Sequence, residues 1–176
     1  MRNSFSIRRL TLSAMLVAVG LLLPFLTGQI QGIGNMLSPM HLPVFIAGLT
    51  CGPIWGTAVG AVLPLLRSAL FGMPPLMPTA LAMTFELAAY GLFSGLLRRL
   101  LPKSLPMLYA TLCASMILGR VVWGIASLFL YGFTSNTFTW QLFVTNGFVK
   151  AIPGIILQLI IIPPIVRALD KTRLAD

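Results

Sequence analysis

Six apolar runs follow one another along the chain, separated by short segments that are polar or rich in glycine and proline. Five of them, with their flanks, are long enough for an α-helix to cross a bilayer. Residues 41–51 are the exception, since at ~1.5 Å per residue that run is too short to cross alone. We expect it to begin inside the preceding loop or to form a tilted, partly unwound span. The predicted spans are residues 11–26, 41–51, 54–71, 79–97, 105–131 and 141–162.

Proline and glycine mark the ends of several runs. The pair Gly52-Pro53 should end the short run, because proline lacks a backbone donor and disfavours helix in the residue before it. The segment GMPPLMP predicts a tight turn, with Pro78 in the first turn of the next helix. The basic start of the chain and its first apolar run could mimic a signal peptide. No small-residue cleavage site follows, so we interpret that run as the first span.

Basic residues in the connections lie on one side of this arrangement. With six spans, three clusters fall together: Arg2, Arg8 and Arg9, then Arg98, Arg99 and Lys103, then Arg167, Lys171 and Arg173. The other three connections carry no charge. Because Lys and Arg in short loops stay cytoplasmic, both termini should be cytoplasmic. Five spans would put the N-terminal arginines opposite the rest, so the charges favour a crossing by residues 41–51.

Composition excludes a water-soluble protein. The 176 residues are 57% hydrophobic and 9% charged, with a mean hydropathy of +0.95, which is more apolar surface than a soluble core can bury. We therefore expect an all-α integral membrane bundle, with residues 1–176 as one domain. The net charge of +9 arises mostly at helix ends and forms no patch for nucleic acid. Cys51 and Cys113 lack metal spacing, so we expect both to pack structurally.

Four charged residues lie inside the predicted spans, where a charge costs at least ~2.5–3.5 kcal/mol on insertion scales. They are Arg67, Glu86, Arg120 and Lys150, one in each of the last four spans. Counted from the span ends at ~1.5 Å per residue, all four fall in the outer half of a ~30 Å core. This convergence predicts a polar pocket that opens to the outside beneath the uncharged loops.

The predicted pocket holds three cations and one carboxylate. The surplus favours an anionic ligand, and arginine can bind a carboxylate through two parallel hydrogen bonds. Alternatively, Glu86 pairs with Arg67 or Arg120, and the other cations extend toward the headgroups. The sequence leaves both interpretations open for the arginines. Lys150 has Asn146 nearby and no carboxylate close in sequence, which favours contact with a ligand.

Further polar and aromatic residues could line the same pocket. His41, the only histidine, lies between two prolines at the outer end of the short run. A lone histidine is more often structural than a ligand, and no Cys, His or Asp cluster predicts a metal or other cofactor. Asn35, Asn146 and Trp123 could add polar and stacking contacts. Tryptophan is ordinarily an interfacial anchor, but Trp123 lies within a span rather than at its edge.

Transport by this chain would need an external source of energy. It has no G-x-x-x-x-G-K-[ST] loop for nucleotide phosphates, and one buried carboxylate is too little for an ion-coupled relay. It also lacks the nucleophile and base, or paired aspartates, of an intramembrane hydrolase, so we expect no enzyme. Ala14 and Ala18, four residues apart in the first span, form a small-residue stripe on which another helix can pack closely.

These features resemble the substrate-binding S components of energy-coupling factor (ECF) vitamin transporters. The resemblance covers nearly the whole chain, in size, six spans, basic cytoplasmic ends and first outer loop, and residues 38–95 look most characteristic. Ala14 and Ala18 are similar to the family's first-span motif that meets the coupling subunit. The resemblance implies a multi-pass protein of a prokaryotic plasma membrane that binds a vitamin. Its implied partners are a membrane coupling subunit and two cytoplasmic ATPases.

The substrate follows less directly from these observations. Members of this family bind neutral vitamins as well as anionic ones. The surplus of cations favours a carboxylate, and a compact one such as pantothenate is favoured by the bulky side chains of Phe45, Met73, Met83 and Trp123. Folate, cobalamin and riboflavin are the alternatives within the family. A small channel or a structural scaffold is the alternative of another class, because pairing between helices could also hold these charges. Purification with an ATPase complex, or with a bound small molecule, would distinguish a transporter from a scaffold.

Overall fold

A computed structural model describes residues 2–26, 37–132 and 139–172 of the chain. No strand occurs among the described residues, which confirms the predicted all-α class. The helices are α1 (Arg2–Leu26), α3 (His41–Cys51), α4 (Pro53–Phe71), α5 (Leu81–Leu100), α6 (Leu105–Tyr131), α7 (Trp140–Val144) and α8 (Ile152–Lys171), with two short π-helical segments, η1 (Leu76–Ala80) and η2 (Thr145–Val149).

Five helical segments are long and apolar enough to cross a membrane. They are Ile7–Phe25, Pro53–Phe71, Leu76–Leu100, Leu105–Tyr131 and Thr145–Lys171, and the shorter α3 is an additional apolar helix. The protein is therefore a multi-pass membrane protein, as its composition predicts.

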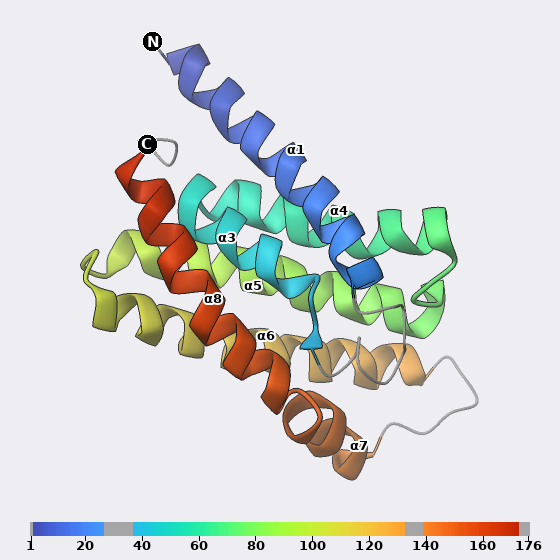
Figure 1. Ribbon diagram of the computed structural model, residues 1–176. Coiled ribbons are helices and arrows are strands. Elements are labelled where there is room, and N and C mark those ends of the chain that lie inside the picture. Colours follow the sequence, from blue (N-terminus) through green and yellow to red (C-terminus); the bar gives the residue numbers. More distant parts are fainter. Residues whose placement is uncertain (1, 27–36, 133–138, 173–176) are drawn as a thin grey trace.

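The short helix α3 forms the centre of the bundle. All 11 of its residues are buried, and it packs against α1, α4, α5 and α8. The helices α4, α5 and α6 run side by side, and α1 and α8 cross them at an angle (Figure 1). At ~1.5 Å per residue α3 is about 16 Å long, roughly half of a hydrocarbon core. It therefore places its first residue, His41, deep within the bundle.

Glycines allow α3, α4 and α5 to approach closely. A Cβ atom added at Gly56 would lie 2.5 Å from the Cα of Gly48 and 2.7 Å from the carbonyl oxygen of Gly91. Each of the three helices contributes one of these glycines, so the backbones themselves are in contact. Such small-residue contacts replace the hydrophobic driving force that is lacking between helices in lipid.

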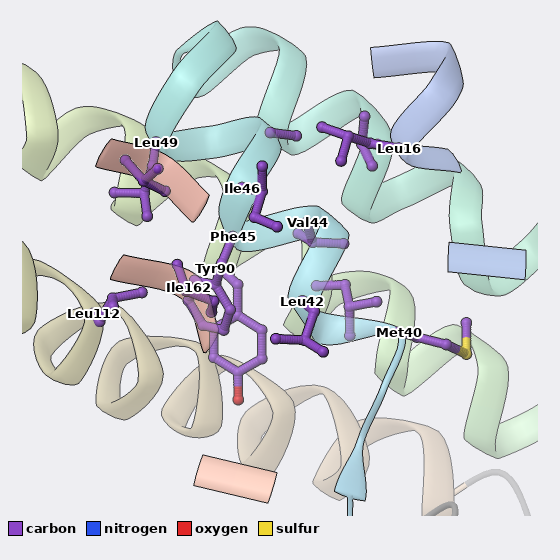
Figure 2. Packing of buried hydrophobic residues seen from close by; sticks show 14 of the residues in the cluster. Leu16, Met40, Leu42, Val44, Phe45, Ile46, Leu49, Tyr90, Leu112 and Ile162 are labelled. Carbon is purple, nitrogen blue, oxygen red and sulfur yellow. The ribbon is translucent and has the colours of Figure 1, made fainter. Parts of the chain in front are cut away.

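Large apolar side chains fill the space around α3. Figure 2 shows Phe45 of α3 next to Tyr90 of α5, and their ring centroids are 4.8 Å apart. Leu112 of α6 and Ile162 of α8 are completely buried in the same cluster. The core thus ties the short helix to the long ones on several sides.

The last predicted span differs from the observed one. Instead of one helix over residues 141–162, α7 and η2 are followed by α8, which begins at Ile152 and continues to Lys171. Pro153 lies at the start of α8, where its missing donor is harmless. The prediction that the span ends before Pro163 and Pro164 was wrong. Proline inside a membrane helix is tolerated when neighbouring groups satisfy the freed carbonyls.

The turn before α5 also differs from the prediction. Pro78 lies in η1 rather than in the first turn of α5. Met77, the preceding residue, has an extended backbone with φ −113° and ψ 137°. Proline disfavours the helical conformation in the residue before it, which accounts for the extended backbone of Met77.

Charged helix ends gather at one end of the bundle. Arg9 of α1, the last residues of α3, Arg98 and Arg99 of α5, and Asp170 of α8 line a common cavity. In Figure 1 the start of α1, the end of α8 and the turn between α5 and α6 lie on the same side, opposite η1 and the end of α6. The described basic residues of the connections are therefore gathered at one end, as the loop pattern predicts, whereas Arg67, Arg120 and Lys150 lie elsewhere.

Candidate functional site

A buried ion pair connects α5 and α6 in the interior of the bundle. Of the two carboxylates that the structure describes, only Glu86 is buried, with 2% of its surface exposed. Arg120 Nη1 lies 2.7 Å from Glu86 Oε1, and the Tyr90 hydroxyl donates a hydrogen bond of 2.8 Å to the same oxygen. Of the two pairings that the sequence allowed for Glu86, the structure therefore contains the one with Arg120.

His41 completes this cluster from α3. Its Nε2 lies 3.7 Å from Glu86 Oε1, and its ring centroid lies 5.3 Å from that of Tyr90. Neither ring nitrogen of His41 has a hydrogen-bond partner in the described part of the chain, although the residue is only 4% exposed. Buried polar atoms are nearly always hydrogen-bonded, so the hydrogen-bonding capacity of this imidazole is unused among the described residues. The four residues Glu86, Arg120, Tyr90 and His41 are named the core cluster below.

The core cluster contains two side chains of the types that commonly bind metals, Glu86 and His41. No group of three or more His, Cys, Asp or Glu side chains that could hold a metal ion occurs among the described residues. One carboxylate shared by a guanidinium, a phenol and an imidazole is instead suited to polar recognition of a small molecule.

Arg67 lies apart from the core cluster. It is buried in α4, and its Nη1 donates a hydrogen bond of 3.1 Å to the carbonyl oxygen of Leu21 in α1. Its guanidinium carbon is 5.7 Å from the ring centroids of both Phe25 and Phe71. This cation–π arrangement joins the ends of α1 and α4. Arg67 has no carboxylate partner in the described residues.

Lys150, Asn146 and Trp123 lie around the α7–η2 segment. Trp123 of α6 stacks on Phe143 of α7 with centroids 6.0 Å apart and an interplanar angle of 20°. Asn146 and Lys150 are exposed, and no described residue forms an ion pair with Lys150. The ion pairs of Glu86 are with Arg120 and His41, so Lys150 is not paired with the carboxylate of the core cluster. Asn35 lies outside the described residues.

The small-residue stripe on α1 faces away from the bundle. Ser13, Leu16 and Gly20 are buried against the other helices, whereas Ala14 and Ala18 are exposed on the outer face of α1. Ala14 and Ala18 are therefore not covered by any described part of the chain, which leaves them accessible to another helix.

The sequence reasoning missed Tyr90 and the ion pair at the basic end. Tyr90 lies four residues after Glu86, a spacing that puts two side chains on the same helix face. That spacing could have identified it. Arg98 Nη2 lies 2.6 Å from Asp170 Oδ2, a contact between residues 72 positions apart. Nothing local in the sequence indicates this second pair.

One comparison with known proteins gives a match. A family model described as "ECF transporter, substrate-specific component" matches residues 8–166. The comparisons with curated proteins and with solved structures found no match. The family match includes all of α3, α4, α5 and α6 and the whole core cluster. We therefore conclude that this chain belongs to the family of ECF transporter substrate-specific components, which bind the substrate rather than transform it.

Proposed function

We propose that this protein captures a vitamin-type micronutrient in the membrane and delivers it to an ECF-type importer. ATP hydrolysis would take place in partner subunits. The observation that carries this proposal is the core cluster, in which three helices bring four polar side chains together inside a membrane bundle of this family. Ionisable groups in such surroundings are expensive and usually mark a ligand pathway.

The core cluster would form the inner wall of the substrate site. The ring nitrogens of His41, which have no hydrogen-bond partner in the described residues, would donate to or accept from a polar substrate group. The α7–η2 segment, packed on Trp123, would supply Asn146 and Lys150 from another side. Asn35 stays an expected contact that precedes α3 in the sequence.

The remaining cations support a carboxylate as the substrate, with the compact pantothenate as the preferred candidate. Glu86 balances Arg120, which leaves Arg67 and Lys150 as the cations of the spans without a carboxylate partner in the described residues. Of these two, Lys150 is exposed, and its side chain has no competing hydrogen bond among those residues. We propose it as the principal contact for the substrate carboxylate.

Ligand titration of the purified protein tests this assignment. Candidate vitamins, and the amide analogue of each acid, would be titrated against the wild type, Lys150→Met and Lys103→Met. Losing a charge-assisted hydrogen bond should weaken acid binding about ten- to a hundredfold in Lys150→Met. Binding of the amide should hardly change. Lys103, an exposed lysine at the basic end, is the matched control and should bind like the wild type.

Two results would count against the proposal. Equal affinity of the wild type for acid and amide would contradict recognition of a substrate carboxylate. It would also remove the reason to prefer pantothenate over folate, cobalamin or riboflavin. Absence of any vitamin binding, together with absence of an ATPase complex on purification, would favour a channel or scaffold.

The exposed face of α1 is proposed as the contact with the membrane coupling subunit. Ala14 and Ala18 leave room for a close approach of another helix. Replacing both with tryptophan should abolish transport and leave substrate binding by the isolated protein unchanged. Ala110→Trp, at an exposed position of α6, is the control and should still transport. Loss of substrate binding in the double variant would mean that the pair supports internal packing instead.

We further propose six crossings, counting α3, with both termini on the cytoplasmic side of a prokaryotic plasma membrane. The segregation of basic residues to one end supports this orientation. In a protein with Cys51 and Cys113 replaced by serine, Thr139→Cys should react with an impermeant thiol reagent from outside. Ser104→Cys should react only from the cytoplasm. The reverse pattern would invert the topology.

A further inference from the structure

Basic residues surround a cavity at the charged end of the bundle, far along the helices from the core cluster. The cavity measures about 570 Å³ and lies between the end of α5, the start of α6 and the end of α8. Its charged lining consists of four cations and one carboxylate: Arg98, Lys103, Arg167, Lys171 and Asp170. Positive charge is therefore in excess around an open volume.

A second cavity adjoins the first and has the same excess. It measures about 470 Å³, shares Arg98, Lys103 and Asp170 with the first, and adds Arg9 and Arg99. The Nε atom of Arg9 is buried without a hydrogen-bond partner in the described part of the chain. A buried donor of this kind calls for an acceptor, which an anion in this second cavity would supply, since Arg9 does not line the first.

Asp170 neutralises only one of these cations. Its Oδ2 atom forms an ion pair with Arg98 Nη2 at 2.6 Å. Lys103, Arg167 and Lys171 are exposed, and no described residue forms an ion pair with them. The lining of the first cavity is thus a ready site for a compact anion with several acceptor oxygens, such as a phosphate group.

We propose that the first cavity binds the phosphate group of an anionic phospholipid. Beside the cations, the cavity is lined by Leu105, Leu108 and Pro164. These apolar side chains suit the glycerol and first acyl carbons of a lipid, which a free phosphate ion lacks. Basic pockets between membrane helices are typical sites for anionic headgroups. The inference depends on the membrane-embedded fold and not on the identity of the substrate.

Lipid titration of the purified full-length protein in a neutral detergent tests the proposal. Phosphatidylglycerol should raise the melting temperature of the wild type, and phosphatidylcholine should not. Arg167→Gln should weaken the apparent affinity for phosphatidylglycerol about fivefold, the effect of one cation near an anionic surface. Asp170→Asn removes the one carboxylate of the lining and should increase the apparent affinity for phosphatidylglycerol. Arg8→Gln, an exposed cation that lines neither cavity, should bind like the wild type.

Several outcomes would overturn the proposal. Equal stabilisation by the two lipids, or an equal loss in Arg167→Gln and Arg8→Gln, would show that no specific site exists. Equal stabilisation by millimolar inorganic phosphate without added lipid would assign the cavity to a free anion instead. Lys171→Gln, in the last turn of α8, serves as a second variant if Arg167→Gln fails to fold.

Discussion

Two arginine–carboxylate pairs connect helices in this protein, and their surroundings differ. Arg120 and Glu86 lie 2.7 Å apart in the interior, where 3% of the Glu86 side chain is exposed. Arg98 and Asp170 lie 2.6 Å apart at the basic end, where 33% of the Asp170 side chain is exposed. Glu86 also accepts a hydrogen bond from the Tyr90 hydroxyl and faces His41. Asp170, in contrast, lies among cations that have no carboxylate partner in the described residues.

The difference shows how depth in the membrane controls charge balance. In low dielectric, an unpaired charge is expensive, so the inner pair must be closely matched and further hydrogen-bonded. At the helix ends, water and headgroups screen and solvate charge, so a surplus of cations is tolerated there. We expect the Arg120–Glu86 pair to contribute to stability, and the basic end of the bundle to contribute to contacts with other molecules.

Breaking the inner pair should have the largest effect. Glu86→Gln leaves Arg120 buried without a counter-charge, which should destabilise the protein by about 3–5 kcal/mol. For a chain of this size that corresponds to a fall of roughly 6–20 °C in melting temperature. Thermal unfolding of the purified protein in detergent measures the effect.

Removing both partners supplies the control. In Glu86→Gln with Arg120→Met, no uncompensated charge is left, so most of the lost stability should return. A double variant no more stable than Glu86→Gln alone would mean that packing, not charge, explains the loss.

The hydrogen bond of Tyr90 should have an intermediate effect. Tyr90→Phe keeps the ring against Phe45 but removes the donor to Glu86, at a cost of about 1.5–3 kcal/mol for a hydrogen bond to a charged group. Tyr109→Phe, at an exposed position of α6, should be close to neutral. Equal melting temperatures for the two variants would contradict a role for the Tyr90 hydroxyl in the core cluster.

Breaking the Arg98–Asp170 pair should destabilise the protein less. Asp170→Asn leaves Arg98 next to an open cavity where water can solvate it, so the loss should be about 1 kcal/mol or less. Thermal unfolding beside Glu86→Gln makes the comparison direct. A loss of stability as large as that of Glu86→Gln would show that water solvates Arg98 at the basic end no better than it solvates Arg120 in the interior.

The smallest expected effect is the dependence of the two stability losses on salt concentration. Raising the ionic strength from about 0.1 M to 1 M shortens the screening length from about 10 Å to 3 Å. The stability difference between the wild type and Asp170→Asn should therefore shrink by a few tenths of a kcal/mol, within the small worth of an exposed pair. The difference for Glu86→Gln should stay constant. Equal salt dependence of the two would remove the distinction on which the comparison rests.

The prediction from the sequence was most accurate where a local pattern decided the structure. The run over residues 105–131 matches α6 (Leu105–Tyr131) because it is predominantly apolar, has no proline after its first turn, and is flanked by Ser104 and Gly132. It failed for the last span, where α8 continues through Pro163 and Pro164. Helix breaking by proline depends on neighbouring groups, which the local pattern does not contain.

What the sequence by itself determined is the class of the protein: apolar runs of spanning length, basic residues at one set of ends, and a few charges too costly to be accidental. Only the tertiary structure decided which of those charges meet. Arg67 and Arg120 have similar predicted depths, yet one lies against α1 and the other binds Glu86. Depth follows from counting residues along a helix, whereas partners follow from how each helix is rotated and packed. The neighbouring helices decide that rotation.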